Sequence, residues 1–195
     1  MNEQRTDVIQ KLVHGAVGIV PGGSLLTEFW KTPLERRKDV WFQAIEKRIQ
    51  ILESNHLVKI EEVFERDDFL DAFMTASVIA VRTSNLNKIK ALENFVCNVA
   101  LYPNVDEAVD SICLSLLSDL SGAHLYVLSR IYVLNDDALP PPKKNVISGY
   151  YDDQEKWNLV KYDLGNRGLI GPFGSAGLSD IAMLLVTRIS SDHLV

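Results

Sequence analysis

Apolar residues recur at steps of three and four along most of this chain, which is the spacing of one face of an α-helix. The pattern starts at Val8, Ile9 and Leu12 and returns in each segment up to residue 134. The helices that it predicts lie at 33–54, 57–65, 86–101 and 122–134, with further helical stripes at 69–81 and 109–117. Each apolar face must be buried against another, so we expect a mainly α fold built as an irregular helical bundle.

The sequence Thr32-Pro33-Leu34-Glu35 predicts where the helix at 33–54 begins. The Thr32 hydroxyl can accept from the free N–H groups of a first helical turn, and the Glu35 carboxylate can accept from the Thr32 N–H. Proline is tolerated at the first helical position because its missing N–H would have no partner there. We therefore place the N-cap of this helix at Thr32.

The segment Phe69–Val81 is apolar almost all round, with Asp71 and Arg82 near its two ends. A helix without a polar face has neighbours on every side. We therefore expect this segment to be the central helix of the domain. We also expect the helices to pack around it without leaving a cavity for chemistry.

The composition changes after residue 134, where Pro140, Pro141 and Pro142 follow one another. Consecutive prolines favour an extended strut and exclude a helix. We therefore divide the chain into a helical bundle at 1–134, a proline-rich linker at 135–145 and a tail at 146–195.

The tail is expected to be a small α+β unit. We predict a helix from Asp152 to about Asn166 and a β-strand at 184–189. Between them, glycines recur at positions 168, 171, 174 and 177. They lack the Lys that a phosphate-binding loop requires, so we interpret them as the tip of a hairpin.

Charge and cysteine content narrow the choice of partners and compartment. The chain carries 20 Lys and Arg against 26 Asp and Glu, a net charge of −6. A nucleic-acid surface needs an excess of basic residues, so we do not expect a nucleic-acid partner. Cys97 and Cys113 are too few for a disulfide framework and lie on apolar stripes, which favours two core residues in a reducing compartment.

The N-terminal residues lack the basic and apolar regions of a secretory signal. The longest apolar stretch, 12–26, is shorter than a membrane span and is broken by Pro21-Gly22-Gly23. We therefore expect a cytoplasmic protein without a membrane partner.

We find no pattern of residues that predicts catalysis. The acidic residues between Glu61 and Asp71 suit the start of a helix, where carboxylates interact favourably with the dipole, better than a cation site. Ser121 and His124 lie three residues apart at a helix start, which favours a cap over a nucleophile and its base. We therefore predict a protein that is not an enzyme, with no catalytic residue, cofactor or metal.

Two groups of residues are candidates for binding. Arg36, Arg37 and Lys38 form a basic face that could take an anion, although acidic neighbours such as Glu35 make a solvated helix face the more common interpretation. The large aromatic side chains that could contact a partner protein are Phe29, Trp30, Trp157 and Tyr162.

The segments Pro21–Leu26, Pro33–Arg37 and Phe69–Thr83, followed by Lys88, Lys90 and Leu92, resemble an uncharacterised family of bacterial all-helical proteins. They are also distantly similar to the abortive-infection alpha proteins of bacterial phage defence, whose Leu-Ser element has its counterpart here at Leu120–Leu128. The resemblance covers about residues 10–135 and implies no catalytic residues.

The tail resembles a winged-helix domain, in which Leu164–Ile170 would end the recognition helix and the strand at 184–189 would belong to the wing. The helix at 122–134 would then be its first helix. A helix that reads DNA exposes basic and amide side chains, whereas this one opens with Asp152, Asp153 and Glu155. We therefore expect a protein-contact surface here rather than a DNA-binding one.

These observations predict a non-enzymatic bacterial interaction or scaffold protein, with a role in phage defence or stress implied by the resemblance. Its partner is unknown, and a second copy of the chain is one candidate. Two alternatives stay open. One is a winged-helix regulator that binds DNA as a dimer, and the other is a membrane-active helical effector that acts through residues 8–30.

Overall fold

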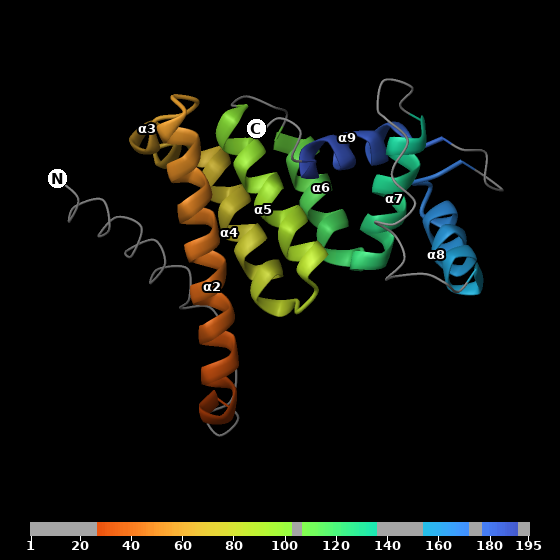
Figure 1. Ribbon diagram of the computed structural model, residues 1–195, viewed down its shortest axis with the longest axis horizontal. Coiled ribbons are helices and arrows are strands. Elements are labelled where there is room, and N and C mark those ends of the chain that lie inside the picture. Colours follow the sequence, from red (N-terminus) through yellow and green to blue (C-terminus); the bar gives the residue numbers. More distant parts are fainter. Residues whose placement is uncertain (1–26, 103–106, 136–153, 172–176, 191–195) are drawn as a thin grey trace.

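The computed structural model describes residues 27–102, 107–135, 154–171 and 177–190. These ranges form eight α-helices, which Figure 1 labels. The helices are α2 (Thr27–Ser54), α3 (Ile60–Phe64), α4 (Asp67–Arg82), α5 (Leu86–Leu101), α6 (Glu107–Asp119), α7 (Gly122–Asn135), α8 (Gln154–Asn166) and α9 (Asp180–Ile189). The prediction of a mainly helical bundle is confirmed for the described part of the chain.

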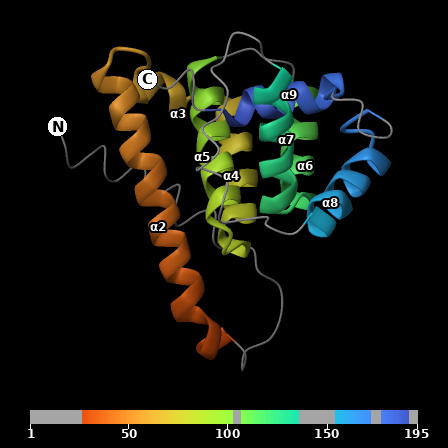
Figure 2. The same cartoon turned by 45° about the vertical axis from the view of Figure 1, so that its right-hand side comes forward.

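The long helices form a row two layers deep, in which α2 packs against both α4 and α5, α4 packs against α6, and α5 packs against α7 (Figures 1 and 2). α9 crosses one end of this row. The first half of α2 extends beyond the row, and α8 packs against α7 at the other side (Figure 2). One connected apolar core includes side chains from α2 to α9, among them Trp41, Phe69, Phe95, Leu128 and Leu185. The helices of the predicted tail therefore share a core with those of the predicted bundle.

The start of α2 differs from the prediction. The helix begins at Thr27, so that Pro33 lies inside it and Thr32 is not its N-cap. Proline within a helix leaves one carbonyl in the preceding turn without its N–H donor, and the residues from 27 to 31 continue the helix on the N-terminal side of this gap. The cap-like pattern at 32–35 is therefore a misleading signal.

The predicted end of α2 near residue 54 is confirmed. His56 has a φ of 58°, and its N–H donates to the Glu53 carbonyl at 2.9 Å. The Leu57 N–H donates to the Leu52 carbonyl at 2.9 Å. These two bonds form a Schellman motif, which satisfies the last carbonyls of the helix and turns the chain away.

The helix that is buried along most of its length is α5 and not α4. All seven residues from Asn94 to Ala100 are buried. In α4, by contrast, Phe69 and Phe73 face the core while Asp71 and Val78 are exposed. The expectation that the segment 69–81 is enclosed on every side is therefore wrong for one of its faces.

Polar side chains from α5 hold the ends of two neighbouring helices. The Lys88 ammonium donates to the carbonyls of Ser118 and Leu120, at 2.7 and 2.8 Å, where α6 ends. The Asn94 amide donates to the Ile189 carbonyl at 2.7 Å. The last carbonyls of a helix have no partner within it, so these bonds satisfy groups that burial would otherwise penalise.

Asn98 acts on the same end of α9 as Asn94. Its amide nitrogen donates to the carbonyls of Arg188 and Ser190, at 2.7 and 3.2 Å. The Asn98 side chain is almost fully buried, and its Oδ1 has no hydrogen-bond partner among the described residues. Two asparagines one turn apart on α5 therefore fix where α9 ends.

The end of α5 is held in a similar way by Arg66. Its guanidinium donates to the carbonyls of Val99 and Ala100, at 2.8 and 3.0 Å. The same group makes two bonds to the Asp68 carboxylate, at 3.0 and 2.6 Å. These bonds lower the pKa of Asp68 below its ordinary value, because they favour the charged carboxylate.

The predicted β-strand at 184–189 is wrong, because these residues belong to α9. The apolar residues Ala182, Leu185, Val186 and Ile189 are buried at the spacing of a helix face, and Ser179 caps the helix through the Ala182 N–H. A run of β-prone residues is thus buried as a helix. The strand that the winged-helix resemblance requires is absent from the described residues.

The glycine-rich segment begins and ends in paired backbone. Ile170 and Leu178 form an antiparallel bridge, and the Gly171 N–H donates to the Gly177 carbonyl at 2.9 Å. This is the pairing expected for the two sides of a hairpin. The residues 172–176 and the predicted linker at 135–145, apart from its first residue, lie outside the described part of the chain.

Candidate interaction groove

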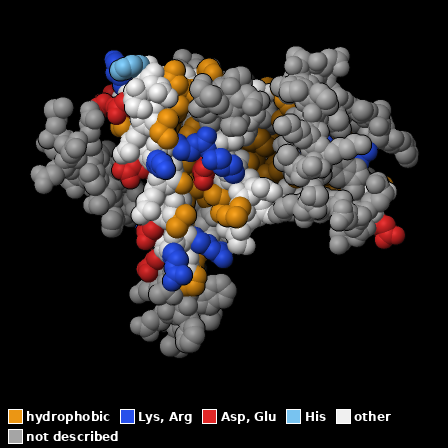
Figure 3. Space-filling model, viewed as in Figure 1, with side chains coloured by type: hydrophobic (Ala, Val, Ile, Leu, Met, Phe, Trp, Pro, Cys, Tyr) orange, Lys and Arg blue, Asp and Glu red, His pale blue; other side chains and the backbone are white. Residues whose placement is uncertain are grey.

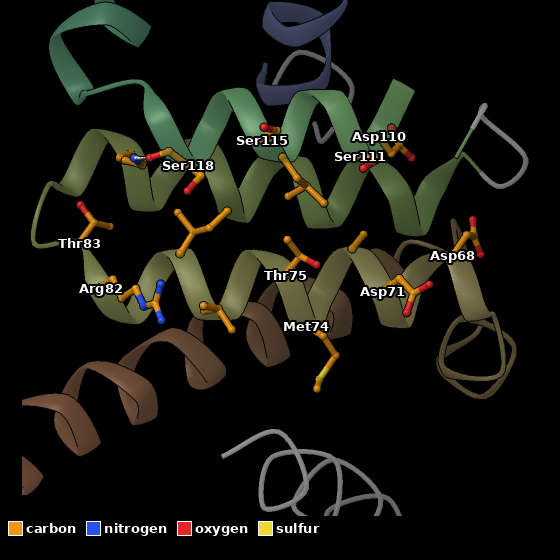
Figure 4. A pocket seen from close by; sticks show the side chains of 15 residues that line it. Asp68, Asp71, Met74, Thr75, Arg82, Thr83, Asp110, Ser111, Ser115 and Ser118 are labelled. Carbon is orange, nitrogen blue, oxygen red and sulfur yellow. Dashed lines mark hydrogen bonds between the residues drawn. The ribbon is translucent and has the colours of Figure 1, made fainter. Parts of the chain in front are cut away.

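A groove of about 930 Å³ runs between α4 and α6. Figure 4 shows the two helices as its walls, with side chains of both pointing into the space between them. The residues that line it are Asp68, Asp71, Ala72, Met74, Thr75, Val78, Ile79, Arg82 and Thr83 on the α4 side, Lys88 from α5, and Asp110, Ser111, Leu114, Ser115 and Ser118 from α6. The segment 69–81 therefore borders an open groove on the side where another helix was expected, and the absence of a cavity for chemistry stays a prediction.

The wall formed by α4 is a single stripe of exposed side chains. Asp71, Thr75, Val78 and Arg82 follow one another at steps of four, three and four, so they lie on one face of the helix. Val78 is 49% exposed, although it is an apolar residue in the middle of the stripe. An exposed apolar side chain between two charged ends is a common property of contact surfaces.

The wall formed by α6 carries small polar side chains. Ser111, Ser115 and Ser118 are exposed and follow the same helical spacing, and the buried Leu114 lies between them and the core. Small side chains allow another helix to approach closely. One wall of the groove therefore has an apolar side chain at its centre, and the other wall has mainly small polar side chains.

Most of the charged groups in the groove already have partners. Asp68 binds Arg66, and the Asp110 carboxylate lies 3.0 Å from the Arg188 guanidinium. The Lys88 ammonium bonds the α6 carbonyls, and burial lowers its pKa, an effect that the charge of Asp119 partly opposes. These groups serve the fold and are not available to a partner.

Asp71 and Arg82 are different, because neither forms an ion pair or hydrogen bond with another described residue. They lie at opposite ends of the groove, Asp71 at the end where α6 carries Asp110 and Arg82 at the end where α6 carries Ser118 (Figure 4). Eleven residues separate them, which is about 16 Å along a helix. The groove thus presents a negative end and a positive end, with Thr75 and Val78 between them.

The predicted basic face lies apart from this groove. Arg36 and Arg37 are exposed and Lys38 is half-buried, all in the part of α2 that extends beyond the row of helices (Figures 1 and 2). Acidic side chains lie beside them, and Figure 3 shows blue, red and orange side chains mixed over α2. This mixture agrees with a solvated helix face, and anion binding there stays a prediction.

The four aromatic candidates do not form one surface. Phe29 and Trp30 belong to the first turn of α2, and Trp157 and Tyr162 belong to α8, on the opposite side of the bundle (Figure 1). The side chains of the first three lie outside the described residues. Tyr162 is 71% exposed, next to Leu159, which is 68% exposed and which the sequence analysis missed.

Ser121, His124 and Asp163 come together where α7 meets α8. The Ser121 hydroxyl lies 2.7 Å from His124 Nδ1, and His124 Nε2 lies 3.0 Å from the Asp163 carboxylate. Arg167 also contacts this carboxylate at 2.8 Å, and the pKa of Asp163 is lowered mainly by Arg167 and further by His124. Three residue types of a hydrolytic triad are therefore present.

The local hydrogen bonds favour a cap instead. The Ser121 N–H donates to His124 Nδ1 at 3.1 Å, and the His124 N–H donates to the Ser121 hydroxyl at 3.4 Å. This reciprocal pair is a capping box in which histidine replaces glutamate, so Nδ1 is occupied by a backbone donor. The prediction of a cap at Ser121 is confirmed, and His124 links the cap to α8 through Asp163.

Other candidates from the sequence analysis have structural roles. Cys97 and Cys113 are buried free thiols, and burial raises the pKa of each to about 11, as expected for core residues. Among the described residues, His, Cys, Asp and Glu do not gather in a group of three or more that could hold a metal ion. No described helix is long and apolar enough to cross a membrane.

Comparisons with protein-family models, with curated proteins and with solved structures find no match to this chain. The resemblances noted in the sequence analysis therefore stay predictions.

Proposed function

We propose that this chain is a protein-interaction module that receives a helix of its partner in the groove between α4 and α6. The proposal depends on one observation. An exposed stripe on α4 carries a carboxylate at one end and a guanidinium at the other, neither with a partner among the described residues, and an apolar side chain between them. Charged side chains that the described part of the chain leaves without partners, next to exposed apolar surface, favour contact with another macromolecule.

The shape of the groove supports a helix as its occupant. Its two walls are parallel helices, so a third helix laid between them can contact both along its length. Asp71 and Arg82 are three turns apart, which matches a short amphipathic helix with complementary charges. A role of such a module in phage defence or stress remains the proposal that the sequence resemblance implies.

The experiment is site-specific photo-crosslinking of the full chain in cells. Benzoylphenylalanine replaces Val78 in the groove, and in a matched control it replaces Val40, an exposed valine on α2. We expect crosslinked protein from position 78, with the attached peptide identified by mass spectrometry, and little from position 40. The proposal fails if the two positions give the same crosslinks, or if position 78 gives none.

A further inference from the structure

We propose that the occupant of the groove is α4 of a second copy of this chain, paired antiparallel with the first. This inference rests on the proposed function, because it names the partner of the same groove. It follows from the spacing of the exposed stripe on α4, from the charges at its two ends and from the small side chains of α6.

The stripe is symmetric about its own centre. Asp71 and Arg82 are equally far from the midpoint between residues 76 and 77, and so are Thr75 and Val78. When two copies of α4 cross antiparallel at this midpoint, Asp71 faces the partner's Arg82 and Thr75 faces the partner's Val78. A self-complementary surface of this kind is what a two-fold symmetric dimer requires.

The charges select the antiparallel arrangement. It forms two ion pairs, one at each end of the helix pair, from groups that have no partner within the described chain. A parallel arrangement would bring Asp71 against the partner's Asp71 and Arg82 against the partner's Arg82, which is repulsive at both ends. The same surface therefore attracts a second copy in one orientation and rejects it in the other.

The wall of α6 leaves room for the second helix. Helices pack with their axes about 8 to 10 Å apart, depending on the side chains between them. Ser111, Ser115 and Ser118 project only small side chains into the groove, so the partner's α4 can contact α4 and α6 together. By symmetry, α4 of the first copy then lies in the groove of the second.

The chain offers another candidate occupant, the segment 1–26, whose charges do not fit. A helix that matches Asp71 and Arg82 needs an acidic and a basic residue eleven positions apart. With histidine neutral at pH 7, the charged residues of the segment are Glu3, Arg5, Asp7 and Lys11, and no two of opposite sign have that separation. α4 itself supplies the required pair.

The test is a charge exchange followed by sedimentation equilibrium of the full chain. We expect the wild type to associate to twice its mass of 21.9 kDa. Asp71→Arg and Arg82→Asp each replace two attractions by two repulsions, and each is expected to weaken dimerisation by about 10- to 100-fold. Both residues are exposed, so the monomer is expected to keep its helical circular dichroism and unfolding midpoint.

Mixing the two variants is the decisive arm. Asp71→Arg carries two basic ends and Arg82→Asp two acidic ends, so a heterodimer restores both attractions and is expected to form where neither variant associates alone. The controls are Arg37→Asp and Asp39→Arg, reversals at exposed positions on α2 that should leave the dimer unchanged. If a reversed variant does not fold, Asp71→Asn and Arg82→Gln remove the charge without adding another.

Three results would overturn this inference: a wild type that stays monomeric, a dimer that neither reversal weakens, and variants that do not associate when mixed. The proposed function would survive each of these if position 78 still crosslinked to another protein. It would fail separately if position 78 crosslinked to nothing or to residues 1–26 of its own chain.

Discussion

α4 and α5 are adjacent helices of 16 residues each, and both carry polar residues between apolar ones. In α5 the buried polar groups bind backbone: Lys88 holds the end of α6, and Asn94 and Asn98 hold the end of α9. In α4 the exposed Asp71 and Arg82 bind no described residue. Polar residues therefore hold neighbouring helices in place in α5, whereas in α4 they form an exposed surface.

The comparison shows what decides the role of a polar residue in a helix. A buried polar group must find a partner inside the protein, and the unsatisfied carbonyls at neighbouring helix ends are the nearest acceptors. An exposed polar group has water as its partner and so remains available to another molecule. Substitutions in α5 should therefore change stability, and substitutions in the stripe of α4 should change association.

Truncation of a core side chain should give the largest contrast. Phe95 in α5 is fully buried, so Phe95→Ala is expected to lower the free energy of unfolding by about 3 to 5 kcal/mol. Val78→Ala, on the exposed stripe of α4, should change the stability of the monomer by less than about 0.5 kcal/mol. Urea unfolding followed by circular dichroism measures both, and equal losses would remove the distinction between the two helices.

The asparagine cap on α9 gives the next test. Asn98→Ala removes the donor to the carbonyls of Arg188 and Ser190, and it should cost about 1 to 3 kcal/mol. Asn87→Ala, an exposed asparagine on the same helix, is the matched control and should cost less than about 0.5 kcal/mol. Hydrogen exchange should also show weaker protection in α9 for the Asn98 variant only. Protection lost equally throughout the protein would argue against a local role at this helix end.

Lys88 sharpens the comparison through its dependence on pH. Lys88→Met is expected to cost about 1 to 3 kcal/mol near neutral pH, because two carbonyls at the end of α6 lose a charged donor. Burial lowers the pKa of Lys88 in the folded state below its ordinary value of 10.5, which it keeps in the unfolded chain. At a pH between the folded-state pKa and 10.5, the unfolded chain binds more protons than the folded one, so the free energy of unfolding rises with pH.

The variant lacks this titration, so the gap in stability between wild type and Lys88→Met should widen as the pH rises through that range. Lys47→Met, at an exposed position on α2, is the control and should show no such trend. Chemical unfolding at a series of pH values measures the difference. A gap that narrows with rising pH would mean that the folded state holds the Lys88 proton more tightly than the unfolded chain does.

The smallest effect is expected at the start of α5. A Cβ at Gly122 would lie 2.2 Å from the Oδ1 of Asn85, which accepts from the Lys88 N–H as the N-cap of α5. Gly122→Ala should therefore displace this cap and cost about 1 kcal/mol, although alanine itself favours a helix. Gly165→Ala, in α8, meets no atom within 4 Å and should not destabilise the protein. Similar unfolding midpoints for the two variants would show that Asn85 adjusts freely.

The sequence predicts the helices well where apolar spacing and end signals agree. The end of α2, the extent of α5 and the cap at Ser121 belong to this group. The prediction of a strand at 184–189 is wrong because a helix can bury β-branched and leucine side chains equally well. The helix also has donors for its last carbonyls, which a neighbouring helix provides. That neighbour is α5, about 90 residues away in the sequence, and local patterns do not contain it.

The groove was partly visible in the sequence. The spacing of Asp71, Thr75, Val78 and Arg82 places them on one side of a helix, which indicates an exposed face. The high apolar content of the segment instead favours a helix that is buried on every side. The approach of Asp163 to His124 has no such signal, because it depends on how α8 packs against α7. Contacts between distant segments of this kind require the tertiary structure.

The bond between Asn94 and Ile189 joins residues 95 positions apart. Ribosomes add roughly 5 to 20 residues per second, so about 5 to 20 s pass between the synthesis of these two residues. During that time the side of α5 that α9 will cover stays open to water, and its two asparagines lack their final acceptors. A nascent chain paused within this interval would leave this apolar surface exposed, so we expect it to depend on holdase chaperones until α9 emerges.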